Sequence, residues 1–142
     1  TQVYLGDGYQ GIKAYTPPKE RRGLVFIDPA FERADEIELF TTGVMNAHQR
    51  WATGIICGWF PLHQPGIENR FYKPLVASKL RSALVVEFCI KPPQELSLYG
   101  CALVIVNPPW KLEHTLQEVL SWLQPRLAGA GQGKVTLRWL AT

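Results

Sequence analysis

The sequence predicts an α/β protein with a mostly parallel sheet. Two observations lead to this fold class: continuous apolar runs that are typical of buried strands, and segments between them whose apolar residues recur at helical spacing. Strands that alternate with amphipathic helices fold as layers around a sheet. The 142 residues are enough for one domain, and 46% hydrophobic with 19% charged residues is typical of a soluble globular protein.

The chain up to Gly54 predicts two strands and two helices. Residues 3–5 read as a strand that enters a Gly-Asp-Gly turn, and a short helix near residues 9–15 ends at Thr16-Pro17-Pro18, because proline disfavours helix at and before its own position. Residues 23–27 form a buried strand. The next helix has Asp35 as N-cap and Glu38 as the second member of a capping box. It runs to Trp51, before Gly54.

The rest of the chain continues the alternation. The expected strands cover residues 55–59 (ended by Pro61), 83–90, 101–106 and 134–140, and the expected helices cover residues 66–80 and 111–127. Pro74 should kink or interrupt the first of these helices. The last strand alternates apolar and polar residues, as a half-exposed strand does.

Composition excludes some classes of function. No apolar run reaches the ~20 residues that span a bilayer, and no signal peptide opens the chain. The cysteines, Cys57, Cys89 and Cys101, lie inside apolar runs, which favours a reducing cytoplasm over disulfides. None of them has a zinc-like ligand spacing, so we expect no metal site. The formal charge of +3 permits an anionic partner without requiring one.

The stretch from Gly6 to Gly11 matches the dinucleotide pattern G-x-G-x-x-G, and Asp28 lies at the end of the next strand, where an acidic residue would hold a nicotinamide ribose. This leaves a nucleotide-dependent oxidoreductase as one alternative. Against it, the helix after the glycines has barely two turns, so its dipole would do little for a pyrophosphate. The glycines would equally serve a tight turn.

Asp28-Pro29-Ala30-Phe31 is close to the Asp/Asn-Pro-Pro-Tyr/Phe tetrapeptide of amino-methyltransferases. An adenine amine is a poor nucleophile because its lone pair is delocalised into the ring. The side chain of Asp28 and the carbonyl of Pro29 can accept its two N–H bonds and favour the pyramidal nitrogen that attacks a methyl group. Phe31 would stack on the extruded base. The alternative without a catalytic role is that Asp-Pro simply ends the strand.

The residues Asn107-Pro108-Pro109-Trp110 match the same tetrapeptide motif more closely. In methyltransferase sheets, however, the last strand of the series runs antiparallel, so its carboxyl end emerges away from the cofactor. We therefore interpret this stretch as a structural turn before the last helix, with Trp110 packed beneath it.

Four segments together resemble the RlmJ family of bacterial ribosomal RNA methyltransferases: residues 21–29, 52–54, 59–61 and 104–113. The resemblance runs over essentially the whole chain, and the string Asn-Pro-Pro-Trp-Lys-Leu-Glu at residues 107–113 is specific. It implies the C-terminal part of a Rossmann-like class I methyltransferase domain. The sheet would be mostly parallel with an antiparallel strand near the C-terminus, and the N-terminal strands would be missing from this chain.

The resemblance also implies a chemistry. The substrate would be an exocyclic adenine amine in large-subunit ribosomal RNA, with DNA possible, and the cofactor would be S-adenosyl-L-methionine. By analogy, Asp28 and Pro29 bind the amine, and Phe31 replaces the usual Tyr. Asp7 and Gly8 would adjoin the cofactor's adenine. Trp59 would contact the target base or form part of the wall of its site. Ala30 departs from the family's second proline.

In the family, the loop for the cofactor's methionine and the acid for its ribose lie upstream of the matching segment. The resemblance therefore implies that the N-terminal half of the domain is needed for cofactor binding, and that this fragment alone is inactive. A cytoplasmic location is expected. A non-catalytic nucleic-acid-binding relative of the fold remains a second alternative, which Ala30 and the absent half favour.

Overall fold

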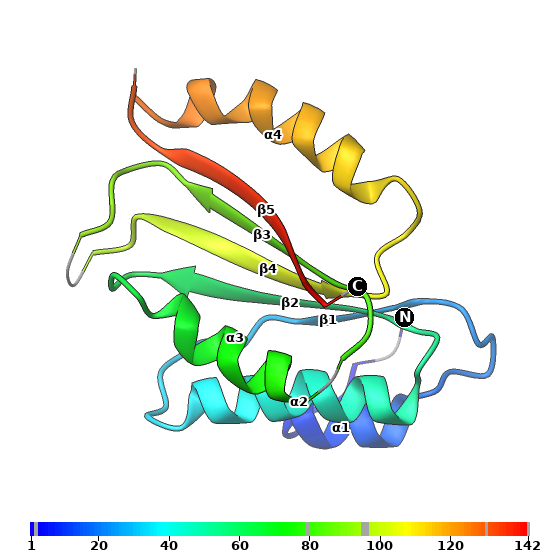
Figure 1. The fold of residues 1–142 in the computed structure, drawn as a ribbon. Coiled ribbons are helices and arrows are strands. Elements are labelled where there is room, and N and C mark those ends of the chain that lie inside the picture. The colour runs from blue at the N-terminus through cyan, green and yellow to red at the C-terminus, as the bar shows by residue number, and fades with distance from the viewer. Residues whose placement is uncertain (2, 79, 95–96, 130, 142) are drawn as a thin grey trace.

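The computed structural model describes residues 1, 3–78, 80–94, 97–129 and 131–141 (Figure 1). Its helices are α1 (Gly8–Tyr15), α2 (Glu36–Arg50), α3 (Glu68–Ala77) and α4 (Leu112–Leu127). Its strands are β1 (Leu24–Ile27), β2 (Ile55–Leu62), β3 (Ala83–Cys89), β4 (Gly100–Val106) and β5 (Lys134–Ala141). The α/β class is therefore confirmed.

The strands form one mixed sheet in the order β1-β2-β4-β3-β5. β1 and β2 are parallel, whereas β4 is antiparallel to both β2 and β3, and β5 is antiparallel to β3. The expected mostly parallel sheet is thus wrong for the described strands, although the antiparallel strand near the C-terminus is confirmed as β4. The reason is the short connection between β3 and β4, which permits a hairpin but not the crossover that parallel strands require.

These directions place three carboxyl ends at one edge of the sheet. β2 and β3 are both antiparallel to β4, so β3 points the same way as β1 and β2. In Figure 1 these three strands end at the left of the molecule, where the loop after β1 and the start of α3 also lie. Ligands of open α/β sheets bind outside such strand ends.

Helices cover both faces of the sheet. α1, α2 and α3 lie on one face and α4 on the other (Figure 1). The larger core, under α2 and α3, contains an aromatic cluster in which Phe60 and Phe71 stack with ring centroids 3.9 Å apart and Phe40 meets both edge-on. Gly58 lets Phe40 approach the sheet, since a Cβ there would collide with the Phe40 ring.

Several local predictions were wrong. Residues 3–5 form no strand, because no described neighbour pairs with them, and Val3 and Leu5 are exposed. β2 continues through Pro61, and α3 continues through Pro74. Asp35 precedes α2 without capping it, because its carboxylate instead binds Arg33 through two contacts of 2.9 Å.

β4 runs antiparallel to β1 and β2. The Asn107 turn therefore lies at the amino ends of β1 and β2, whereas Asp28 lies at their carboxyl ends. The Asn107 side chain donates to the carbonyl oxygens of Ala52 and Gly54, both at 2.8 Å, where the chain enters β2. Its structural role is confirmed. The expected burial of Trp110 is wrong: this side chain is 85% exposed, with the Lys111 ammonium 4.2 Å from its ring centroid.

Candidate active site

A pocket of about 390 Å³ opens at the carboxyl end of β1, between the start of α1 and the loop that leads to α2. Its polar lining comes from residues far apart in sequence, namely Asp7, Gly8, Tyr9, Asp28, Arg33 and Glu36, and its apolar lining is Ile12, Phe26, Ile27 and Pro29. The volume falls in the range of small-molecule sites. Four of the sequence-predicted site residues, Asp7, Gly8, Asp28 and Pro29, are therefore brought together here.

Asp7 is the N-cap of α1. Its Oδ1 accepts from the backbone N–H groups of Tyr9 at 2.8 Å and Gln10 at 3.4 Å. Gly8 follows as the first helical residue, and a Cβ there would meet open space. The pocket wall thus presents the Asp7 carboxylate beside the start of α1, where it can accept hydrogen bonds from a heterocycle.

Asp28 and Pro29 follow the last residue of β1 directly. Asp28 is exposed and Pro29 is half-buried, and both border the same pocket as Asp7. The pairing of Ile27 with Gly58 holds this strand end against β2. A side-chain oxygen and a backbone carbonyl oxygen of adjacent residues are therefore presented at one fixed strand end.

Phe31 lies outside this pocket. Its backbone has a left-handed φ of 54°, and its half-buried ring packs toward the core, with centroids 5.9 Å from Phe40, 5.9 Å from Phe71 and 6.2 Å from Trp59. Phe31 instead lines a neighbouring pocket of about 160 Å³. In this conformation its ring closes the core beyond the end of β1.

Trp59, in β2, does not line the 390 Å³ pocket. It follows Gly58, the partner of Ile27, so it stands beside the strand end that carries Asp28. Its half-buried side chain meets the Phe31 ring. The structure thus places Trp59 next to the site and behind Phe31.

Sequence reasoning missed a hydrogen bond that joins the two sides of the pocket. The Tyr9 hydroxyl donates to Oε1 of Glu36 at 2.8 Å, and Glu36 is only 6% exposed at the first turn of α2. Burial raises the pKa of Tyr9 well above its usual range, and the hydrogen-bonded Glu36 carboxylate raises it further. The Tyr9 ring packs on Gly43 of α2, where a Cβ would be 2.7 Å from the ring. No sequence signal links residues 27 positions apart.

The dinucleotide pattern finds little support in the geometry. A βαβ unit needs a strand before the glycines, and residues 3–5 are not in one. α1 has eight residues, and Asp7, which occupies the second position of the pattern, is the N-cap of this helix. Within the residues that the structure describes, no group of three or more His, Cys, Asp or Glu side chains is placed to hold a metal ion.

The fold and this pocket define an α/β protein with a pocket at the carboxyl end of β1, one of its parallel strands. Comparison with known families identifies the group. A family model described as "Ribosomal RNA large subunit methyltransferase D, RlmJ" matches residues 1–141, and the chain belongs to this family.

Two curated relatives carry the name Ribosomal RNA large subunit methyltransferase J. The Escherichia coli (strain K12) protein is 34% identical over 140 residues, which cover 98% of this chain and 50% of that protein. The Haemophilus influenzae protein is 36% identical over 139 residues, which cover 97% of this chain and 50% of that protein. The chain thus spans about half the length of the curated relatives it matches.

A crystal structure of a Legionella pneumophila protein assigned to the DUF519 family has a similar fold. It superimposes with a TM-score of 0.84 at 28% identity, covering 94% of this chain and 49% of that one. Among the described residues, no helix is long and apolar enough to cross a membrane.

Proposed function

We propose that this chain is the C-terminal part of an S-adenosyl-L-methionine-dependent methyltransferase that modifies the exocyclic N6 amine of adenine in large-subunit ribosomal RNA. One observation carries the proposal. Asp28 and Pro29, the pair that would bind the amine, line the same pocket as Asp7 and Gly8, the pair that would adjoin the cofactor. Belonging to the RlmJ family supports the substrate class.

The residues of the pocket fit an adenine-containing cofactor. Asp7 uses Oδ1 for both described capping bonds, so among the described residues Oδ2 is left to accept from an amine. Gly8 leaves room for a planar ring against the helix start, and Ile12 and Phe26 supply apolar surface. When bound, the cofactor would supply an activated methyl group.

The protein's own part in the reaction is to orient the target amine. The Asp28 carboxylate and the Pro29 carbonyl oxygen would each accept one N–H bond, which draws the nitrogen out of conjugation and aims its lone pair. Asp28 or solvent would take up the proton that the amine loses when it is methylated. Such hydrogen bonds accelerate the reaction because they are strongest in the transition state.

The upstream half of the domain would complete the site. β1 is an edge strand whose other side pairs with no described strand, and its Leu24 and Phe26 side chains are 58% and 55% exposed. Exposed apolar residues on an open edge are typical of a surface that another segment covers. We propose that residues 1–142 are a single unit, and that upstream strands extend its sheet into a Rossmann-like class I methyltransferase fold.

A non-catalytic nucleic-acid-binding relative is the second candidate. Two observations favour it: Ala30 replaces the proline that would stiffen the loop, and the Phe31 ring packs into the core rather than beside Asp28. In such a protein RNA or DNA would bind without turnover.

The experiment that separates the two candidates is substitution of Asp28 in the complete protein, which this proposal extends upstream of residue 1. Asp28→Ala should abolish methylation of unmodified large-subunit ribosomal RNA while RNA affinity stays nearly unchanged. Asp28→Asn, which keeps one acceptor oxygen, should retain part of the activity. Full activity in Asp28→Ala would overturn the assigned chemistry, and an inactive parent protein that still binds RNA would favour the non-catalytic candidate.

A further inference from the structure

A second pocket opens at the same edge of the sheet as the Asp28 pocket. It has a volume of about 390 Å³ and lies where β2 and β3 end, enclosed by the start of α3, the β3–β4 connection and the start of β5. In the strand order, β1 and β3 are three positions apart, which at about 4.8 Å per strand separates the two pockets by roughly 14 Å. The β3-end pocket plays no part in the proposed chemistry.

The inner wall of the β3-end pocket carries a fixed carboxylate. Glu87 of β3 is 19% exposed, and its Oε1 accepts from the Tyr72 hydroxyl at 2.7 Å. The Arg138 guanidinium lies 3.9 Å from the same oxygen and 4.4 Å from the centroid of the Tyr72 ring. Glu87 is therefore held in place by two partners while it faces the pocket.

The mouth of the pocket carries cations. Lys91, just after β3, and Lys134, the first residue of β5, are both exposed and both line the pocket. Pro92 and Pro93 add apolar surface beside Lys91, and the buried Tyr99 ring closes the floor toward β2. A second carboxylate, Glu68 of α3, balances the two lysines.

This distribution of charge fits one nucleotide of an RNA strand. Carboxylates inside the pocket repel a phosphate but accept hydrogen bonds from the N–H groups of a base, whereas the lysines at the mouth attract the phosphate. Pro92 and Pro93 provide an apolar wall against which a base can pack. A free anion alone would gain little from a pocket that holds as many acids as lysines.

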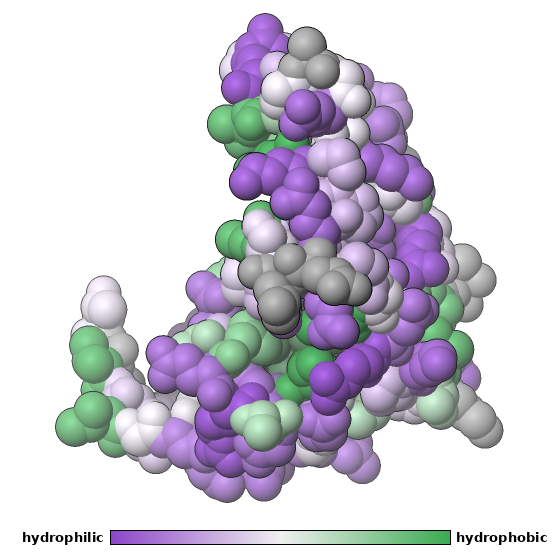
Figure 2. Space-filling view, turned by 90° about the vertical axis from the view of Figure 1, so that its left-hand side faces the viewer, coloured by the Kyte–Doolittle hydropathy of each residue, from purple (hydrophilic) through white to green (hydrophobic). Residues whose placement is uncertain are grey.

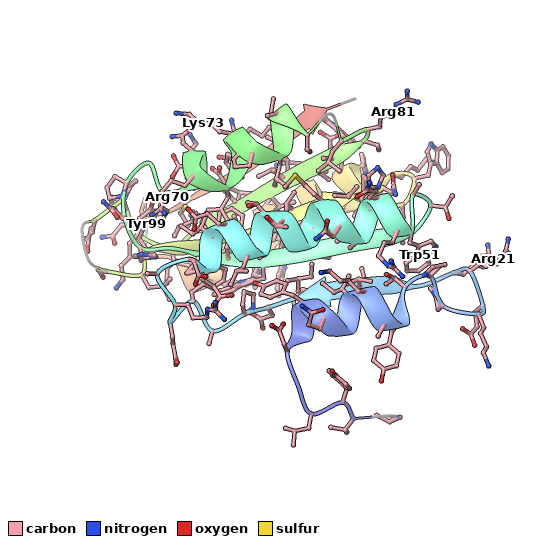
Figure 3. The ribbon with its side chains drawn as sticks, turned by 90° about the horizontal axis from the view of Figure 1, so that it is seen from below. Arg21, Trp51, Arg70, Lys73, Arg81 and Tyr99 are labelled. Carbon is pink, nitrogen blue, oxygen red and sulfur yellow. The ribbon has the colours of Figure 1, made fainter. Side chains whose placement is uncertain are left out.

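The position of the pocket favours an RNA that reaches both sites. Figure 2 looks onto this edge and shows hydrophilic residues along it with smaller hydrophobic patches between them. Arg70 of α3 lines the small pocket next to Phe31, between the two larger pockets. Figure 3 shows Arg70 and Tyr99 at this end of the molecule, whereas Arg21, Trp51 and Arg81 lie at the opposite end.

We infer that the β3-end pocket binds a nucleotide that flanks the target adenine in the RNA strand, with its base toward Glu87 and its phosphate at Lys91 and Lys134. The inference rests on the proposed function, because it takes RNA as the substrate. It adds a recognition site that would select the sequence or shape around the target.

Isotope-labelled protein titrated with a short single-stranded RNA that contains adenine tests the two pockets separately. The amide signals of Gly8 and Ala30 report the Asp28 pocket, and those of Lys91 and Thr136 report the β3-end pocket. We expect saturable shifts in both sets. Adenosine monophosphate, titrated in parallel, shows whether a free nucleotide occupies the second pocket without the strand.

The matched variants are Lys91→Ala/Lys134→Ala and, as control, Lys13→Ala/Lys19→Ala, which removes two exposed lysines outside both pockets. The first pair should weaken RNA binding several-fold and lower the slope of log affinity against log salt by about 0.7, because the two lysines share one phosphate and each phosphate contact on a single strand contributes about 0.7. The control pair should keep more of the parent affinity and salt slope.

Shifts confined to Gly8 and Ala30, or equal effects of the two variant pairs, would overturn the inference and leave the proposed function standing. Shifts at Lys91 and Thr136 with the mononucleotide but not with RNA would also overturn it. If RNA shifts only the β3-end set, the inference stands and the Asp28 site loses support. If RNA shifts neither set, the inference is wrong.

Discussion

At the scale of single residues, Asp7 and Asp28 face one pocket under different structural demands. Asp7 caps α1, so its carboxylate stabilises the fold as well as the pocket. Asp28 is exposed at a strand end, where a carboxylate contributes little to folding. Loss of activity after substitution of Asp28 is therefore easier to assign to chemistry than loss after substitution of Asp7.

The hydrogen bond between Tyr9 and Glu36 leads to a stability prediction. Tyr9→Phe removes the hydroxyl and leaves the buried Glu36 carboxylate without that donor, which should lower the free energy of unfolding by about 1–3 kcal/mol. Urea unfolding at neutral pH measures the change. Tyr15→Phe is the control, because Tyr15 is exposed at the end of the same helix and its change should stay within about 0.5 kcal/mol. Equal effects of the two variants would contradict the assigned role.

Cys57 gives a prediction on pH. Burial raises the pKa of this thiol to about 11, against roughly 8.5 for an exposed cysteine. Below pH 8.5 the thiol is neutral in both states and its contribution to stability is fully present. Above that pH the unfolded chain ionises first, so stability falls until about pH 11, by up to roughly 3 kcal/mol.

Urea unfolding from pH 8 to 10.5 measures this decline, and Cys57→Ala should make it less steep without removing it, because burial also raises the pKa of the Cys89 thiol to about 11. The alanine variant starts from a lower stability because of the smaller side chain, so the informative quantity is the dependence on pH. An unchanged dependence in Cys57→Ala would show that other groups cause the decline.

At the scale of elements, the direction of β4 decides which of two similar tetrapeptides belongs to the site. Asp28 and Asn107 both follow buried strands and precede proline. β4 is antiparallel to β2, so Asn107 comes out at the edge where β2 begins and there bridges two backbone carbonyls. Asn107 therefore connects the end of β4 to the segment that enters β2.

Substitution of Asn107 should therefore affect folding. Its φ of 53° suits asparagine and glycine better than other residues. Asn107→Ala loses two hydrogen bonds and adds backbone strain, a combined cost of about 3 kcal/mol in the free energy of unfolding. Asn107→Gly loses the bonds alone and should cost about 1 kcal/mol less. Thermal or urea unfolding distinguishes the pair, and a loss of RNA methylation without loss of stability would contradict this role.

At the scale of the whole molecule, the asymmetry of the sheet is the main feature. One edge strand, β5, is flanked by α4, and its Trp139 donates to Glu113 of that helix at 2.8 Å. The other edge strand, β1, exposes two large apolar side chains. A pocket of about 690 Å³ between α1 and β1 adds to the uncovered surface on that side.

This asymmetry predicts the result of a cofactor titration. Calorimetry with S-adenosyl-L-methionine should show no saturable binding to residues 1–142 and clear binding to a protein extended upstream, because the β1 side of the pocket is open. Binding by the short chain would show that the described pocket suffices. Binding by neither would move the assignment to the non-catalytic candidate.

Local sequence patterns predicted most elements, and together with the family resemblance they predicted the pocket's main residues. Apolar runs and helical spacing report burial at each position, so β1 to β5 and the four helices of the described chain lie close to where the patterns put them. Asp28-Pro29 was found because a polar residue that ends a strand stands out against apolar neighbours, whereas the place of Asp7 and Gly8 beside a cofactor was implied by the family resemblance. The family membership was also determined at this level.

Only the tertiary structure decided how these parts meet. Strand pairing depends on contacts between distant segments, which local patterns do not encode, so the mixed sheet, the bond between Tyr9 and Glu36 and the β3-end pocket could not be predicted. The Phe31 ring turned toward Phe40 and Phe71, and Trp110 toward solvent, for the same reason: a side chain's direction follows from which surfaces the completed fold leaves open.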